Sequence, residues 1–507
     1  MRCGDAYRMF RAVLGCWMLL GLANAEPVPD FAINAAISGS ATVSTLALET
    51  KALFQSISLV PLQLKSGYKR LETVTTALEQ IATQLVTTGA TLAQAISTMT
   101  LNNSGPIPTF FNDISNAIST LQAIISSGLN GQMNTLTQNI DSYVTIKLQD
   151  SFRTLIGTLN SLSQTLTALR TAVTNARTAS GSSPTVSATV ARRFVTSRIV
   201  ADFTSSVRLL KSDVPILVFI LRTTMGSFQN ADVYLISITA EAKLREQDVA
   251  DYGTAYATEV NSYASTLKTN TTTELGTPYQ AVKQAYATDL KTTVETDANF
   301  KSTVDGMFTK MDGLFADSPT VSGTIDNTFS AYLQQILALD DDLAAFYGTS
   351  MCSLIQDLVQ VLIENGPNAQ FCFSKFGQKV FNLFVTHTYD VTDCYRLQMF
   401  RLERLRTTAY YFVKLILHDI EDVVENVQHC IRIADYQQCV PFLGSEYLKL
   451  FTYTTEKRDY LYRLLEKETQ GSYLRMAGCY SNSKHLLILD AELMQSDIDY
   501  CDINGPL

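Results

Sequence analysis

The residues best suited to chemistry are the cysteines, and they gather toward the C-terminus. Nine cysteines occur in the 507-residue chain; Cys3 and Cys16 lie in an N-terminal apolar leader, and none lies between residues 26 and 351. Because a leader of this kind sends a chain through an oxidising compartment, the remaining cysteines are expected to form disulfides. The disulfide candidates are Cys352, Cys372, Cys394, Cys430, Cys439, Cys479 and Cys501.

The number of these cysteines is odd, so one thiol must be free or bonded to a second chain. Their spacings do not determine which cysteines pair. A disulfide-linked homodimer therefore stays open as an alternative to a monomer with one free thiol. No CxxC pair occurs, which argues against both a zinc ribbon and a thioredoxin-like redox site.

The histidines offer weaker chemistry. His418 and His429 are separated by about 16 Å on a helix, too far to share one metal ion. His418 and Asp422 could contribute to an acid/base or metal site, but surface histidines beside a solvated acidic face are the simpler interpretation. The full set is His387, His418, His429 and His485.

Searches for familiar catalytic motifs are negative. The chain has no dinucleotide-binding glycine motif, phosphate-binding loop, HExxH, GxSxG or EF-hand loop. We therefore expect a protein that is not an enzyme, with no catalytic residues, no cofactor and no metal. An unfamiliar enzyme is the alternative, and a pocket that gathers His418 with carboxylates would support it.

The first 25 residues predict a secretory signal peptide. Three arginines precede an apolar stretch over residues 12–22, and Ala23-Asn24-Ala25 fits signal peptidase. No later apolar run reaches the roughly 18 residues of a transmembrane helix. The expected location is secreted and extracellular. Two N-glycosylation sequons, at Asn102 and Asn270, are then expected in surface loops.

Charge is sparse and unevenly distributed. The net charge of -9 argues against nucleic-acid binding, which needs a basic surface. Residues 26–180 contain 16 charged side chains, and residues 351–507 contain 35. This change coincides with the first of the later cysteines and predicts a domain boundary near residues 340–350. The expected organisation is a signal peptide (1–25), a Thr/Ser/Ala-rich long-helix region (26–185), a central helical region (186–345) and a cysteine-bearing helical domain (346–507).

Hydrophobic periodicity predicts an all-α protein of long amphipathic helices. Apolar residues recur every three or four positions from Leu71 to Met99 and from Phe152 to Val173. An antiparallel bundle is favoured over a dedicated oligomeric coiled coil, although a coiled-coil homodimer stays open. The turn-like segments 102–106 and 180–184 would let helices fold back. The apolar run 214–221 is expected in a buried helix, and Val440-Pro441 is expected to break one.

The polar faces of the N-terminal helices carry Thr, Ser and Gln in place of Glu and Lys. This pattern fits either a merely solvated face, which is the simpler interpretation, or a hydroxyl-rich face for O-glycans or for contact with a carbohydrate matrix. In the central region Tyr252, Tyr256 and Tyr263 recur at near-helical spacing, and Tyr279 and Tyr286 do so again. Such tyrosines are expected to pack their rings and keep their hydroxyls in water.

The cysteine-bearing segment resembles that of secreted insect proteins with a TsetseEP-type domain. The resemblance is carried by the spacings from Cys352 to Cys501, although the Glu-Pro repeats of the founding member are absent. It implies an extracellular, gut-associated protein and supplies no catalytic residues.

The residues as a whole favour a secreted, non-enzymatic helical protein with a structural, adhesive or protein-interaction role. Its expected partner is an extracellular protein or glycan. A carrier of lipids or small apolar ligands is the alternative, because amphipathic helices can open around an apolar cargo.

Overall fold

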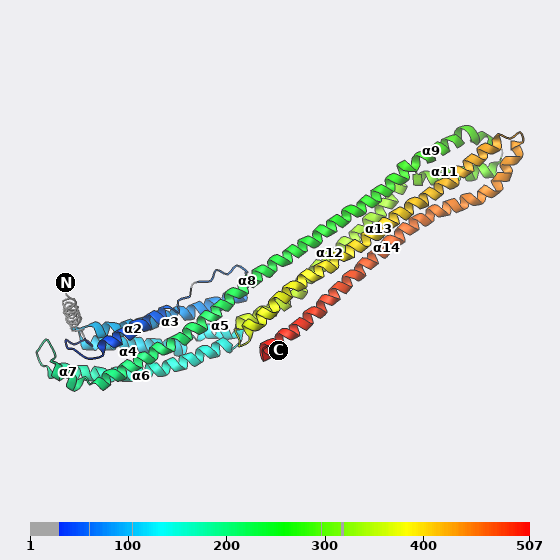
Figure 1. Ribbon diagram of the computed structural model, residues 1–507. Helices are drawn as coiled ribbons and strands as arrows, with labels where there is room; N and C mark the ends of the chain where they lie inside the picture. The colour runs from blue at the N-terminus through cyan, green and yellow to red at the C-terminus, as the bar shows by residue number, and fades with distance from the viewer. Residues whose placement is uncertain (1–29, 60, 104, 296, 316–318, 507) are drawn as a thin grey trace, which may run out of the picture. The chain divides into compact units, whose positions relative to one another are not determined.

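A computed structural model describes residues 30–506 except 60, 104, 296 and 316–318. The expected signal peptide lies outside these residues. Within them the protein is all-α, as predicted, with no β-strand and an isolated β-bridge between Asp30 and Ile33. Figure 1 shows long helices throughout. No helix of the described residues has an apolar stretch long enough to cross a bilayer.

The helices divide into a shorter set followed by a longer one. The shorter set is α2 (Ser40–Gln55), α3 (Lys69–Leu101), α4 (Ile107–Ala123), α5 (Asn130–Ile140), α6 (Tyr143–Ala179) and α7 (Ala188–Phe194). The longer set is α8 (Ser197–Thr269), α12 (Pro319–Glu364), α13 (Ala369–Ile431) and α14 (Tyr436–Asn504), with α9 (Gly276–Ala285), α10 (Lys291–Val294) and α11 (Ala298–Phe315) inserted between α8 and α12. Three π-helical turns occur at η1 (Ile124–Gly128), η2 (Asn270–Glu274) and η3 (Tyr286–Leu290).

The chain forms two compact units that are discontinuous in sequence. Unit 1 contains the described residues of Met1–Ser237 together with Asp357–Lys375 and Ile498–Leu507, and unit 2 contains Ile238–Gln356 and Phe376–Asp497. This division differs from the expected sequential one, because the cysteine-bearing segment contributes to both units. The chain leaves unit 1 within α8 and re-enters it within α12 and again within α14, so segments distant in sequence share one core.

The core of unit 1 follows the predicted periodicity. Every apolar residue of the α3 stripe is buried, and α3 packs against α2, α4 and α5, which confirms bundle packing. The two predicted turns follow α3 and α6. An extended segment before α3 is held by Asp232 of α8, whose carboxylate accepts hydrogen bonds from the amides of Lys65 and Ser66 at 2.9–3.1 Å. The buried α3 stripe consists of Leu71, Val74, Leu78, Ile81, Leu85, Leu92, Ile96 and Met99.

Two expectations about helices are wrong. The run 214–221 lies in α8, but only one side of it is buried; Phe219 is 67% exposed and Ile216 is 52% exposed. A helix in a bundle buries a stripe, so a continuous apolar run leaves part of itself in solvent. Pro441 does not break a helix either. It lies in the second turn of α14, which begins at Tyr436, and there it removes a single backbone hydrogen bond.

Candidate functional site

Three disulfides connect the same two helices, α13 and α14. Cys430–Cys439 closes the turn between them, Cys394–Cys479 joins them within unit 2, and Cys372–Cys501 joins them within unit 1. Their Cα–Cα separations of 5.8, 6.0 and 5.8 Å lie in the usual range. We call this pair of helices the α13–α14 hairpin. The pairing was not predictable from spacing, because it depends on which faces of the two helices meet.

The seventh cysteine is Cys352. Its thiol is free and exposed on α12, where its Sγ lies 3.2 Å from the side-chain amide of Gln356. The expectation of one cysteine outside the intramolecular disulfides is therefore confirmed for the described residues. An exposed thiol is open to reagents and to a second chain.

The histidines do not form one site. His418, His429 and His485 are exposed, and the Nδ1 atom of His418 lies 3.0 Å from Glu421 rather than beside Asp422. No group of three or more His, Cys, Asp or Glu residues with metal-binding geometry is found among the described residues. The arrangement of His418 and Asp422 therefore gives no support to an acid/base pair.

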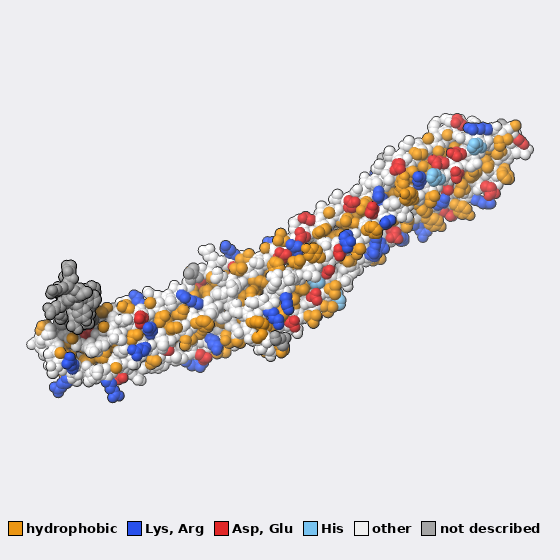
Figure 2. All heavy atoms as spheres, in the orientation of Figure 1, with side chains coloured by type: hydrophobic (Ala, Val, Ile, Leu, Met, Phe, Trp, Pro, Cys, Tyr) orange, Lys and Arg blue, Asp and Glu red, His pale blue; other side chains and the backbone are white. Residues whose placement is uncertain are grey.

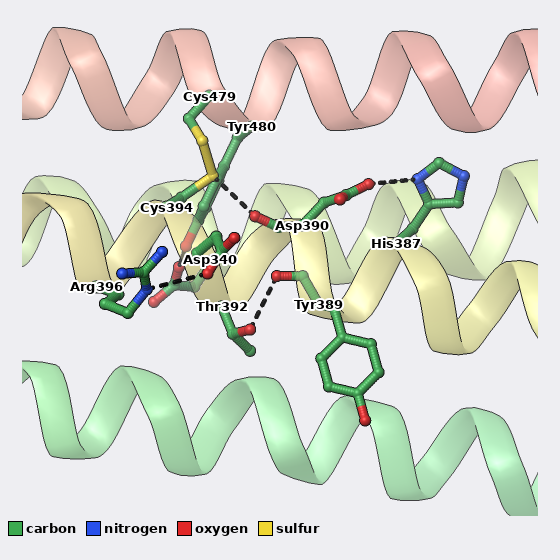
Figure 3. The surroundings of a disulfide bond; sticks show 10 residues. Asp340, His387, Tyr389, Asp390, Thr392, Cys394, Arg396, Cys479 and Tyr480 are labelled. Carbon is green, nitrogen blue, oxygen red and sulfur yellow. Dashed lines mark hydrogen bonds and ion pairs between the residues drawn. A yellow bond between two sulfur atoms is a disulfide. The ribbon is translucent and has the colours of Figure 1, made fainter.

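Sequence reasoning missed His387, the one buried histidine. It lies on α13 at 2% exposure, with Nδ1 3.3 Å from Asp390 and Nε2 3.4 Å from Asp490 of α14. Figure 3 shows His387 pointing toward Asp390. Asp390 lies one helical turn before Cys394, which forms the disulfide with Cys479. The imidazole ring thus lies between a carboxylate of α13 and a carboxylate of α14. This contact joins the two helices of the hairpin.

A second feature that sequence reasoning missed is a buried layer of tyrosines in unit 2. Asp340 of α12 accepts hydrogen bonds on Oδ1 from Tyr395 of α13 at 2.6 Å and Tyr480 of α14 at 2.7 Å. Gly253 of α8 lies against this group, with no side chain to separate them. Burial raises the pKa of the Asp340 carboxyl, although the two tyrosine hydrogen bonds oppose that rise.

The layer continues to a second tyrosine pair. The hydroxyls of Tyr256 and Tyr332 are hydrogen-bonded to each other, and Tyr332 is hydrogen-bonded to Ser472 at 3.0 Å. Ser472 donates to Gln398 Oε1 at 3.0 Å. The expectation that Tyr256 keeps its hydroxyl in water is therefore wrong. Burial raises the pKa of Tyr256, Tyr395 and Tyr480, so their hydroxyls stay protonated donors.

This layer links α8, α12, α13 and α14 through a nearly complete set of hydrogen bonds. Such a network favours one alignment of the four helices, because a shift would leave buried hydroxyls unpaired. Its hydroxyl donors already have acceptors within the layer. The layer therefore fits a structural role.

The outer surface of the α13–α14 hairpin carries large apolar side chains in regular register. On α14, Phe442, Tyr453, Tyr460 and Leu474 are separated by 11, 7 and 14 residues, close to whole numbers of turns, and Leu489 and Leu493 extend the series. We call these six residues the α14 apolar stripe. They are 41–76% exposed. Exposed Tyr389, Leu397, Phe400, Tyr411 and Leu415 recur in the same way on α13.

The helices α2 to α6 present a different surface. Their large hydrophobic residues that are exposed are Leu48, Leu101 and Ile146. Figure 2 shows this contrast on one face, where uncharged polar groups dominate the N-terminal helices and apolar and charged side chains mix over unit 2. The α13–α14 hairpin thus exposes more large apolar side chains than helices α2 to α6 do, which makes it a candidate surface for contact with another macromolecule.

The two sequons lie in different settings. Asn102 follows α3 in the predicted turn, where its Oδ1 accepts a hydrogen bond from the Gly105 amide at 2.8 Å. Asn270 begins the π-helical turn η2, so the expected loop is absent there. The side chain of Thr271 beside it is buried. Asn102 thus lies in a turn, as expected, and Asn270 in a helical turn, and both side chains are half-buried.

The described residues form an all-helical protein in which three disulfides join two long helices, α13 and α14. Comparisons with protein-family models, curated proteins and solved structures gave no match. The resemblance to TsetseEP-type proteins stays a prediction.

Proposed function

We propose that the protein is a secreted, non-enzymatic helical scaffold whose α13–α14 hairpin binds another extracellular protein. The observation that carries this proposal is the concentration of exposed Tyr, Phe and Leu side chains on a hairpin that three disulfides hold together. Aromatic residues supply much of the binding energy in protein interfaces. A surface that is rigid before binding also loses less conformational entropy.

The charges beside the apolar residues support a protein partner. Arg404 lies over the Phe400 ring at 5.1 Å, and Lys449, Glu456 and Lys467 lie close to the line of the α14 apolar stripe. Apolar centres with charges of both signs around them are typical of protein interfaces. The disulfides are compatible with the oxidising environment that secretion would provide.

Site-specific photo-crosslinking tests this proposal. A photoreactive residue at Tyr460 should crosslink one defined protein in the extracellular fluid of the source organism. The same residue at exposed Thr167 of α6 is the control and should not. Equal products from both positions, or none from Tyr460, would contradict the proposal. The double variant Tyr453→Ser/Tyr460→Ser should then weaken the purified complex at least about tenfold.

The alternative, a carrier of apolar ligands, is tested on the same purified protein. Native mass spectrometry followed by lipid extraction should find no stoichiometric lipid. If near-stoichiometric lipid is bound and is removed by extraction, the proposal that the protein acts only through its surface is wrong.

A further inference from the structure

Helix α3 has two grooves on one side, five helical turns apart. The first lies between α3 and α5, has a volume of about 550 Å³ and includes Thr73, Thr76, Ala77 and Gln80. The second lies where α3 faces α2 and α4, has a volume of about 420 Å³ and includes Thr91, Gln94, Ala95 and Thr98.

These α3 residues correspond in pairs at a spacing of 18 residues: Thr73 with Thr91, Thr76 with Gln94, Ala77 with Ala95, and Gln80 with Thr98. Because 18 residues are five turns, the grooves share one side of the helix and lie about 27 Å apart. Each groove thus has an alanine on its floor and hydroxyl or amide side chains at its edge.

The surface between the grooves is of the same kind. Thr83, Gln84 and Thr87 continue along this side of α3. We call the resulting series the α3 polar strip; it consists of Thr73, Thr76, Gln80, Thr83, Gln84, Thr87, Thr91, Gln94 and Thr98. The strip itself contains no charged side chain, whereas Glu72 lines the first groove and Lys51 and Asp113 line the second. Glu79 lies to one side of it, where it accepts a hydrogen bond from the amide of Leu62.

The threonine hydroxyls of the strip are already oriented. Those of Thr73, Thr76, Thr87 and Thr91 donate to the carbonyl four residues earlier at 2.7–2.9 Å. Each hydroxyl proton is therefore directed inward, and the oxygen lone pairs remain as acceptors. Because β-branched side chains have few rotamers, fixing these threonine side chains on ligand binding costs little conformational entropy.

Each groove adds groups that suit a hydroxylated ring. In the first, Gln132 donates to Oε1 of the exposed Gln80 at 3.1 Å, at the edge of the groove. In the second, Lys51 donates to Gln94 Oε1 at 2.8 Å, and the half-buried ring of Phe110 forms part of the wall. A sugar has both an apolar ring face and many hydroxyls, which match these groups.

We propose that the α3 polar strip binds a linear, uncharged polysaccharide that reaches from one groove to the other. Ligand hydroxyls donate to the threonine oxygens and exchange hydrogen bonds with the glutamine amides, and ring faces lie on Ala77, Ala95 and Phe110. The strip contains no cationic side chain, and the carboxylates of Glu72 and Asp113 line the two grooves beside it. Phosphate-rich or sulfated polymers need cationic partners, so this arrangement argues against them. This site lies on α3 and does not depend on the protein-binding surface of the α13–α14 hairpin.

Sedimentation with insoluble polysaccharide tests the proposal on the full mature chain. Chitin and cellulose are the neutral probes, and immobilised heparin is the charged comparison. We expect retention on at least one neutral polymer that persists in 0.5 M NaCl, with soluble hexasaccharides competing better than disaccharides of the same sugar. Retention on heparin alone, or on no neutral polymer, would overturn the proposal.

The chain offers a closely matched pair of variants. Thr87→Ala/Thr91→Ala removes two strip hydroxyls, whereas Thr167→Ala/Thr171→Ala removes two exposed α6 hydroxyls that make the same bonds four residues back. The first variant should weaken retention about tenfold or more and the second less than about twofold. Equal effects would overturn the proposal. Circular dichroism must show both variants folded, as alanine favours helix.

Discussion

The hydroxyl of Tyr480 on α14, which is buried in unit 2, donates a hydrogen bond to Oδ1 of the half-buried Asp340 on α12 at 2.7 Å. The same oxygen accepts the hydroxyl of Tyr395 from α13. One carboxylate thus satisfies donors from two other helices. This relationship makes Asp340 the residue on which the buried layer most directly depends.

Replacing Asp340 should therefore destabilise unit 2. Asp340→Ala leaves two buried hydroxyls without their acceptor, at a cost of roughly 2–4 kcal/mol. Asp340→Asn keeps an acceptor oxygen and should recover much of that loss. Urea unfolding followed by tyrosine fluorescence measures both, and Asp341→Ala at the exposed neighbouring position is the control. Equal stability of the Ala and Asn variants would contradict this account.

Glu364 should make stability depend on pH. Burial first, and then the nearby charges of Asp502 and Asp141, raise the pKa of its carboxyl. A raised pKa in the folded state means that this carboxyl favours folding most at low pH, and that its contribution is lost as pH rises through the folded pKa. Glu364→Gln should therefore melt at a higher temperature than the native protein at pH 7.

The difference between the two melting temperatures should shrink as pH falls toward 4. The Gln side chain can still accept the hydrogen bond that Gln360 donates to Glu364 at 2.6 Å, so the comparison isolates the charge. A melting-temperature difference that does not change with pH would refute the assignment.

Gly89 should be intolerant of a side chain. A Cβ at this buried α3 position would lie 2.2 Å from the ring of Phe54 on α2, and Phe54 is itself fully buried. Gly89→Ala should cost roughly 1–3 kcal/mol through overpacking. Gly157→Ala in α6, where nothing lies within 4 Å of the added Cβ, should stabilise the helix by about 1 kcal/mol. A higher melting temperature for Gly89→Ala than for Gly157→Ala would contradict the close contact between α2 and α3 at Gly89.

Cys352 should be the reactive thiol of the protein. Intact-mass analysis after maleimide treatment without reduction should show one added label per chain, and none for Cys352→Ser. If Cys352 joins two chains, the unreduced protein should instead have twice the mass and separate on reduction, and the variant should be monomeric. More than one label on unreduced chains would show that the disulfide pairing is different.

The sequence by itself determined the elements. The all-α class, the buried stripe of α3 and the turns after α3 and α6 follow from periodicity and turn residues, which are local properties. The odd number of cysteines in the later part of the chain likewise required one thiol outside the intramolecular pairs. The two errors at Phe219 and Pro441 arose because an apolar run or a proline does not reveal how a whole helix is packed.

Only the tertiary structure decided which faces meet. It paired Cys394 with Cys479, left Cys352 exposed, and placed Tyr256 in a buried hydrogen-bonded layer instead of at the surface. It also placed the α3 polar strip beside grooves formed by α2, α4 and α5. Each of these facts depends on how helices pack against one another. The periodicity of a single helix shows only which of its sides is apolar.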